Sequence, residues 1–216
     1  MHIRPKPWAR PELEDCGFFI SDPTSCPGKW CSFFDQIQPI HMELGCGKGT
    51  FIAAKGIQNP DINYIAVDMI DAVLGLSKRT IAAVYGERPV DNIRLIAYDI
   101  ERINQMMNTD DPIERIYINF CNPWPKRRHY KKRLTHTRQL EKYKEFMTPG
   151  SEIYFKTDDD ALFEASLGYF EAAGFQVITL IRDLHASDFK DNIVTEHEQM
   201  FSNQGIPIKF AIARLH

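Results

Sequence analysis

Short apolar runs alternate with amphipathic stretches along this chain from residue 39 onward. The apolar runs have the length of buried strands, and they lie at 39–43, 63–67, 93–97, 115–120 and 151–156. Between them, apolar residues recur at three- and four-residue spacing, which predicts helices with one buried face. These helices lie at 48–58, 71–85, 137–147 and 161–173, and a shorter one is expected after Asp99. The alternation predicts an α/β fold with a mostly parallel sheet.

The C-terminal part of the chain breaks this alternation. Residues 175–181 and 207–215 both have the pattern of strands, and no long helix is predicted between them. Two such strands form an antiparallel pair at one edge of the sheet. Five strand–helix units followed by a hairpin are typical of the Rossmann-like sheet of class I methyltransferases, so we expect seven strands. A dehydrogenase would more often add a second domain, for which no residues are left.

The length of the chain suits one well-packed domain better than two. It has 216 residues, of which 44% are apolar. Residues 1–36 are rich in proline and aromatic residues, which predicts an irregular N-terminal arm packed on a domain of residues 37–216. Arg4, Lys6 and Arg10 in this arm are either phosphate contacts or ordinary surface charges.

Net charge and cysteine content bear on whether the protein binds nucleic acid, metal or membrane. The formal net charge is −3, so any contact with a nucleic acid must depend on a local basic patch. The five cysteines include no C-x-x-C pair, which predicts reduced thiols in a cytoplasmic protein and no metal site. No apolar run has the length of a signal peptide or a membrane span, so we expect a soluble protein with no membrane partner.

A glycine-rich loop follows the first predicted strand. Gly45, Gly47 and Gly49 permit positive φ angles and a close approach of a ligand to the backbone. The dinucleotide fingerprint needs its third glycine one place later, where this chain has Thr50. A shorter loop preceded by an acid, Glu43, fits S-adenosylmethionine better, because this ligand carries an ammonium and a sulfonium that a carboxylate can oppose.

Two further acids end the next two predicted strands. Asp68 follows the second strand, where an acid commonly accepts hydrogen bonds from both ribose hydroxyls. Asp99 follows the third strand, where a side chain meets the adenine edge. A single acid at a strand end is more often a helix cap. Three acids beside one glycine loop favour a cofactor site.

The fourth strand runs into the sequence Asn122-Pro123-Trp124-Pro125, and six cations follow within residues 126–133. The prolines stiffen this loop and prevent a helix from continuing. Trp124 offers an aromatic face on which a base can stack, and filling the space beneath the loop is an equally good role for it. The cations can contact the phosphates of a folded RNA.

Acidic residues also follow the fifth strand and precede the last one. Asp158 and the run Thr195-Glu196-His197-Glu198 are expected on the same rim of the sheet. A carboxylate can accept two hydrogen bonds from the N1–H and N2–H₂ edge of guanine, an edge that adenine lacks. These acids therefore favour guanine weakly, because acids also cap helices.

Together these residues resemble a known family. The motifs E-x-G-x-G-x-G at 43–49, N-P-W-P-K-R-R-H at 122–129, F-K-T-D at 155–158 and T-E-H-E at 195–198 are similar to those of the bacterial tRNA (guanine-N7-)-methyltransferases. The likeness extends from Arg4 nearly to the C-terminus. It implies a Rossmann-like enzyme that uses S-adenosylmethionine to form 7-methylguanosine in the tRNA variable loop.

The resemblance also implies roles for individual residues. The cofactor contacts of the family match Glu43, Asp68, Asp99 and Asn122, beside the glycine loop. Its substrate contacts match Lys126, Asp158, Thr195, Glu196, His197 and Glu198. Its RNA-interacting segment matches Arg128, His129, Tyr130, Lys131, Lys132 and Arg133.

Two positions depart from the family pattern. The family usually has Glu where this chain has Asp68, which shortens the reach by about 1.5 Å. It also has Asp where this chain has Asn122, so an amide replaces a carboxylate regarded as catalytic. Guanine N7 carries a lone pair and no proton, so methyl transfer needs positioning more than a general base. We therefore expect a slower enzyme with Asn122 as its catalytic residue.

Two alternative functions stay open at this stage. An exocyclic amino methyltransferase uses an N-P-P-aromatic loop at the same strand end, but here the second proline comes after Trp124. A catalytically weak RNA-binding protein would retain the fold and the basic segment while losing chemistry at Asn122. Both a monomer and a homodimer are compatible with the sequence.

Overall fold

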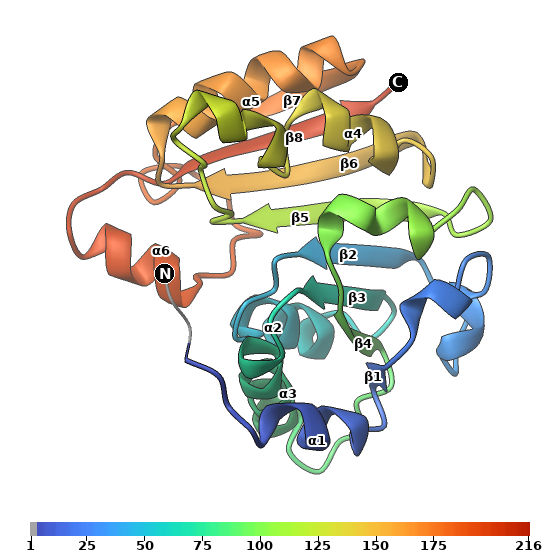
Figure 1. Ribbon diagram of the computed structural model, residues 1–216. Coiled ribbons are helices and arrows are strands. Elements are labelled where there is room, and N and C mark those ends of the chain that lie inside the picture. The colour runs from blue at the N-terminus through green and yellow to red at the C-terminus, as the bar shows by residue number, and fades with distance from the viewer. Residues whose placement is uncertain (1–3) are drawn as a thin grey trace. The chain divides into compact units, whose positions relative to one another are not determined.

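The apolar runs form strands in the computed structural model, which describes residues 4–216 (Figure 1). The chain divides into two compact units, Met1–Asp111 and Pro112–His216. The first three residues of the predicted arm lie outside the described residues. The boundary predicted at residue 36 stays a prediction.

Unit 1 contains four parallel strands in the order β1-β4-β3-β2. Their bounds are Phe19–Ile20 for β1, Ile40–Leu44 for β2, Asn63–Asp68 for β3 and Ile93–Ala97 for β4. Three α-helices accompany them: α1 at Ala9–Glu14, α2 at Thr50–Gln58 and α3 at Asp71–Tyr85. Short 3-10 helices lie at Pro23–Ser25, Trp30–Phe33 and Ile100–Gln105. Every residue of β2 is buried, including the polar His41 and Glu43, as is usual for a strand of a parallel sheet.

The described part of the N-terminal arm packs on unit 1. Gly75 in α3 allows this close approach, because a Cβ atom there would lie 2.9 Å from the Cβ of Ala9 and 2.8 Å from the Trp8 ring. The guanidinium of Arg79 lies 3.7 Å from the centre of that ring. The buried carboxylate of Asp111 accepts a hydrogen bond of 2.6 Å from the backbone of Gly28. The arm is thereby held by ring stacking at one end and by a buried acid at the other.

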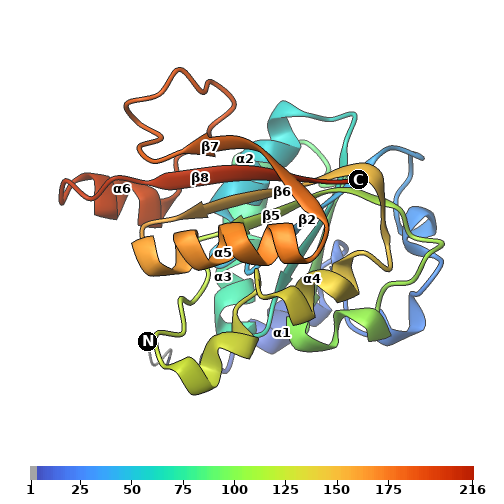
Figure 2. The same ribbon diagram turned by 90° about the horizontal axis from the view of Figure 1, so that it is seen from above.

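Unit 2 contains four strands in the order β5-β6-β8-β7. Their bounds are Ile113–Asn119 for β5, Met147–Thr157 for β6, Phe175–Ile181 for β7 and Lys209–Leu215 for β8. The β5 and β6 strands are parallel, whereas β8 is antiparallel to both β6 and β7. The helices are α4 at Thr137–Tyr143, α5 at Asp160–Ala172 and α6 at Glu196–Ser202, with a 3-10 helix, η4, at Arg127–Lys132. Figure 2 shows α5 running alongside these strands.

The core of unit 2 is aromatic. The Phe155 ring on β6 stacks with Phe163 of α5 at a centroid separation of 6.1 Å and meets Phe170 edge-on. All three side chains are fully buried. These contacts come from the helical spacing of the two phenylalanines in α5, which places both on the face that covers the strand.

The predicted α/β class is confirmed, with mostly parallel strands and a C-terminal antiparallel hairpin. Residues 4–216 form eight strands rather than seven, because the two-residue β1 in the arm pairs with β4. The helix predicted at 137–147 ends earlier, at Tyr143, and Met147 already pairs with Ile113 of β5. No helix within residues 4–216 has the length and apolar character needed to cross a membrane.

Candidate functional site

The glycine loop of unit 1 turns sharply between β2 and α2. Its three glycines all have positive φ angles, 83° at Gly45, 56° at Gly47 and 79° at Gly49. A Cβ atom at either of the first two would meet no atom within 4 Å, whereas one at Gly49 would clash with the Ser77 hydroxyl and lie 3.0 Å from the Cα of Ser77. Gly49 is therefore required by packing as well as by its backbone angle. The open space beside Gly45 and Gly47 leaves room for a ligand at the loop.

The acids predicted at three strand ends lie at one edge of unit 1. Parallel pairing of β2 with β3 and of β3 with β4 brings Glu43, Asp68 and Asp99 to this edge. Glu43 is only 2% exposed. Burial, together with the negative charges of Glu43 and Asp68, raises the pKa of the Cys46 thiol in the loop. The carboxylates of Glu43 and Asp68 therefore place negative charge beside the glycine loop, where it could oppose a cationic ligand.

Asp68 and Asp99 also form hydrogen bonds to the backbone. Asp68 accepts one of 3.1 Å from Gly47 N and another of 3.1 Å from Ile70 N. Burial raises the pKa of Asp68 despite these bonds. Asp99 caps the 3-10 helix that follows it by accepting from Glu101 N at 2.9 Å. A carboxylate has about four acceptor positions, so both acids retain capacity for a ligand.

In unit 2, the loop after β5 has a strained backbone on either side of Asn122. Phe120 and Trp124 have φ angles of 51° and 44°, which residues with a side chain rarely adopt. Asn122 is exposed, and its Oδ1 accepts a hydrogen bond of 3.0 Å from Trp124 N. Burial raises the pKa of the Cys121 thiol to about 12, so Cys121 is not a nucleophile at neutral pH.

The basic segment, residues 126–133, packs against the same loop. The Lys132 Nζ lies 5.2 Å from the centre of the Trp124 ring, and His129 meets the ring edge-on at 5.5 Å. Burial, followed by the charges of neighbouring cations, lowers the pKa of His129. Within the segment, Lys126, Arg127, Arg128, Lys131 and Lys132 are exposed. Both predicted roles of Trp124 are compatible with this arrangement.

Arg133 differs from the other cations of the segment. It is 3% exposed, donates a hydrogen bond of 2.8 Å from Nε to Pro123 O, and lies over the Tyr130 ring at 3.8 Å. Its guanidinium therefore supports the loop rather than facing solvent. The RNA contact expected of Arg133 stays a prediction, and burial together with the bond to Pro123 O gives this residue a structural role as well.

Asp158 lies near the Asn122 loop within unit 2. The β5 and β6 strands are in register at Asn119 and Lys156, and Phe120 N donates to Lys156 O at 2.8 Å. The residues that follow each strand are therefore neighbours. Burial and the adjacent Asp159 raise the pKa of Asp158, and the charges of Lys209 and His197 only partly oppose this.

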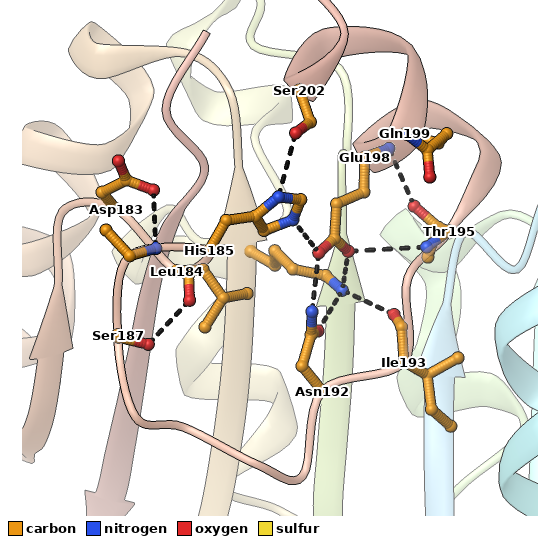
Figure 3. Close-up of polar contacts among 12 residues, drawn as sticks. Asp183, Leu184, His185, Ser187, Asn192, Ile193, Thr195, Glu198, Gln199 and Ser202 are labelled. Carbon is orange, nitrogen blue, oxygen red and sulfur yellow. Dashed lines mark hydrogen bonds and ion pairs between the residues drawn. The ribbon is translucent and has the colours of Figure 1, made fainter. Parts of the chain in front are cut away.

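The run Thr195-Glu196-His197-Glu198 begins α6 as a capping box. Thr195 Oγ1 accepts a hydrogen bond of 3.1 Å from Glu198 N. His197 is exposed, and its ring stacks on Phe120 at a centroid separation of 6.1 Å. Glu198, which is labelled in Figure 3, is fully buried. Its carboxylate contacts Lys156, which lies two residues before Asp158.

The sequence did not predict the partners of Glu198. Lys156 belongs to the F-K-T-D motif, but its pattern gave no signal of a buried ammonium. His185 and Asn192 lie in the irregular segment before α6, and both contact the Glu198 carboxylate. Burial acts to raise the pKa of Glu198, but the Lys156 ammonium and these hydrogen bonds outweigh it, so the pKa lies below its ordinary value.

Solved structures of similar architecture show which fold this chain has. The 16S rRNA methyltransferase KamB matches with a TM-score of 0.62 and 11% identity, over 87% of this chain and 92% of that one. The 16S rRNA (adenine(1408)-N(1))-methyltransferase from Catenulisporales acidiphilia matches with a TM-score of 0.57 and 12% identity, over 99% and 93%. At these identities the likeness shows the fold alone, which is that of the Rossmann-like methyltransferases.

Sequence comparison then gives the family. The family model described as "Putative methyltransferase" matches residues 37–211. The tRNA (guanine-N(7)-)-methyltransferase of Clostridium beijerinckii is 58% identical over 99% of this chain and 98% of its own length. That of Clostridium tetani is 46% identical over the full length of both. The chain belongs to the tRNA (guanine-N(7)-)-methyltransferase family, which confirms the resemblance seen in its motifs.

Substitution of Gly49 tests the packing of the glycine loop. We expect Gly49→Ala to lower the free energy of unfolding by about 2–4 kcal/mol, because it combines a left-handed φ with a clash against Ser77. Gly45→Ala is the matched control: it has a similar φ but open space, and we expect a loss of about 1–2 kcal/mol. Urea unfolding of both variants measures the difference, and equal losses would show that the Ser77 contact is unimportant.

Proposed function

We propose that this protein transfers the methyl group of S-adenosylmethionine to N7 of a guanosine in the variable loop of tRNA, in the cytoplasm. The observation that carries the proposal is the match of nearly the whole chain to relatives of that activity. Two features of the structure support it, namely the acid-flanked glycine loop of unit 1 and the exposed basic segment beside Asn122 in unit 2.

The residues of unit 1 fit S-adenosylmethionine. Glu43 would oppose its ammonium and sulfonium, Asp68 its ribose hydroxyls, and Asp99 its adenine edge. The positive φ angles at the glycines shape the turn of the loop, and the space at Gly45 and Gly47 allows a ligand to approach it closely. When bound, the sulfonium supplies an electrophilic methyl group. A dinucleotide suits the site less well, because Thr50 takes the place of the third glycine of its fingerprint.

The residues of unit 2 would hold the tRNA. The five exposed cations of residues 126–132 provide a local positive surface on a chain of net charge −3, and such a surface binds phosphates without reading sequence. Asp158 offers a carboxylate to the guanine edge close to the Asn122 loop. His197, stacked on Phe120, offers a second ring surface beside it. These neighbours position the nucleoside rather than exchange protons with it.

Methyl transfer to N7 requires little acid–base chemistry. N7 attacks through its lone pair, and the purine becomes cationic as the carbon–sulfur bond breaks. The protein therefore has to align the two reactants and exclude water. Asn122 presents its amide on a rigid loop whose geometry is maintained by Trp124 N and Arg133. Its carbonyl dipole stabilises the developing positive charge less than a carboxylate would.

Nucleoside analysis tests the proposed activity. Purified protein, labelled S-adenosylmethionine and unmodified tRNA should yield 7-methylguanosine after digestion of the tRNA. Formation of N6-methyladenosine instead would indicate an exocyclic amino methyltransferase. Binding of tRNA without any methylated product would indicate an RNA-binding protein that has lost catalysis.

The basic segment should control the salt dependence of tRNA binding. We expect the combined replacement of Arg128, Lys131 and Lys132 by Ala to weaken binding and to reduce the slope of log K against log salt by about 2 to 3. Cofactor affinity should be unchanged. The matched control replaces three cations outside the segment, Lys29, Lys144 and Lys190, and should retain the parent slope. Filter binding at several salt concentrations measures both, and equal slopes would show that the segment is only a solvated surface.

Asn122→Asp should raise the rate of methyl transfer on the order of tenfold, which corresponds to about 1.4 kcal/mol of barrier. The new carboxylate can accept the same hydrogen bond from Trp124 N, so the loop retains its geometry while gaining negative charge for the cationic product. Asn122→Ala, which removes that bond, should be slower than the parent. Single-turnover kinetics with saturating cofactor measures the rate of the parent and of both variants. If Asn122→Asp is no faster than the parent, the missing negative charge at this position does not limit the rate.

A further inference from the structure

The Glu198 carboxylate is the centre of a buried polar network in unit 2. Its Oε1 accepts hydrogen bonds from His185 Nε2 at 2.7 Å and Asn192 Nδ2 at 2.6 Å. Its Oε2 accepts from Lys156 Nζ at 2.5 Å and from Thr195 N at 3.4 Å. Figure 3 shows His185, Asn192 and Thr195 converging on the carboxylate of Glu198. The side chain of Glu198 is 0% exposed.

These four donors use the whole acceptor capacity of the carboxylate. An ionised carboxylate has about four lone-pair positions, and each oxygen of Glu198 already has two donors. A guanine N–H group could bind there only by displacing one of them. Displacement is costly, because it would leave a buried donor without a partner. Glu198 is thus occupied by the protein itself and fully buried, whereas Asp158 is only half-buried.

Lys156 connects this network to the Asn122 loop. Besides Glu198, its ammonium donates to Asn192 Oδ1 at 2.9 Å and to Ile193 O at 3.0 Å. The same ammonium lies 5.8 Å from the centre of the Phe120 ring. Phe120 begins the strained loop and stacks with two rings of α6, His197 at 6.1 Å and Phe201 at 6.0 Å. The buried ion pair therefore fixes α6 against the loop that carries Asn122.

We propose that Glu198 is a positioning residue, which acts with Lys156 to hold α6 against Phe120, and that Asp158, which is not part of α6, is the carboxylate that reads the guanine edge. This inference rests on the proposed function. It gives different roles to two acids that the sequence places on one rim of the sheet: the buried Glu198 builds the support, and the half-buried Asp158 faces the substrate. An ion pair in this network fixes the geometry of the site without touching the base.

Inosine distinguishes positioning from direct contact, because it is guanosine without the 2-amino group. Two tRNAs, with guanosine or inosine at the methylated position, are assayed with the parent and with Glu198→Gln. A misplaced α6 should slow transfer to both tRNAs by the same factor, on the order of 10- to 100-fold, so the preference for guanosine is unchanged. Asp158→Asn should instead reduce that preference.

Glu152→Gln is the matched control for Glu198→Gln. Glu152 lies on the same strand, β6, and pairs with Arg214 at 2.7 Å and Arg115 at 3.3 Å, so the substitution removes a paired carboxylate away from α6. It should leave the methyl-transfer rate within about twofold of the parent.

A second pair of variants at the partly exposed His185 perturbs the network more gently. His185→Ala removes a donor to Glu198 and should slow transfer, whereas His185→Gln retains an amide donor and should restore much of the rate.

These experiments distinguish failure of the inference from failure of the proposed function. A guanosine preference that disappears in Glu198→Gln would show direct contact with the base and overturn the inference. The inference would also be overturned if the parent methylated the guanosine and inosine tRNAs at the same rate. It would likewise be overturned if both His185 variants had the methyl-transfer rate of the parent. If the parent forms no 7-methylguanosine at all, the proposed function fails instead. Calorimetry with S-adenosylhomocysteine should give parental affinity for every variant, because the cofactor residues proposed in unit 1 are unaltered.

Discussion

Parallel strand pairing is the constraint on which both candidate sites depend. In a parallel pair the carboxyl ends of the strands meet at one edge, so residues far apart in sequence become neighbours there. In unit 1 this edge brings together Glu43, Asp68 and Asp99. In unit 2 the pairing of β5 with β6 does the same for the Asn122 loop and Asp158. Both groups of residues are placed by backbone hydrogen bonds, whatever their own chemistry.

Many of the polar side chains at these edges form hydrogen bonds with the backbone of the protein, whether or not a ligand is bound. Asp68 holds the glycine loop, Asp99 caps a 3-10 helix, Asn122 closes a turn and Arg133 holds Pro123 O. Such bonds orient each side chain and reduce the freedom that binding would otherwise have to remove. They also limit what each group can still do. All acceptor positions of the Glu198 carboxylate are already filled by donors of the protein. Glu198 therefore differs from Asp158 in what it can offer a ligand.

The Asn122 loop shows how a rigid site can be maintained at a cost. Two residues with side chains adopt positive φ angles around Asn122, and each such residue costs about 1–2 kcal/mol. Contacts elsewhere in unit 2 compensate, including the buried Arg133 and the rings stacked on Phe120. A site whose chemistry needs alignment more than proton transfer gains directly from this rigidity. Replacing a carboxylate by an amide changes the charge of such a loop but not the bond that shapes it.

The sequence alone determined the alternation of strands and helices, the terminal hairpin, the glycine loop and the family, because these depend on local periodicity and on motifs of adjacent residues. It did not reveal β1, which is too short to have a period, or the early end of α4 before β6. Only the tertiary structure decided which charged residues are available to a ligand. Arg133 and Glu198 belong to motifs that suggest binding, yet both are buried. Arg133 contacts Pro123 and Tyr130, and the Glu198 carboxylate is bound by Lys156 and His185, which are distant in sequence. The free energy of a charge depends on the water and donors around it, and these come from residues that the chain brings together only by folding.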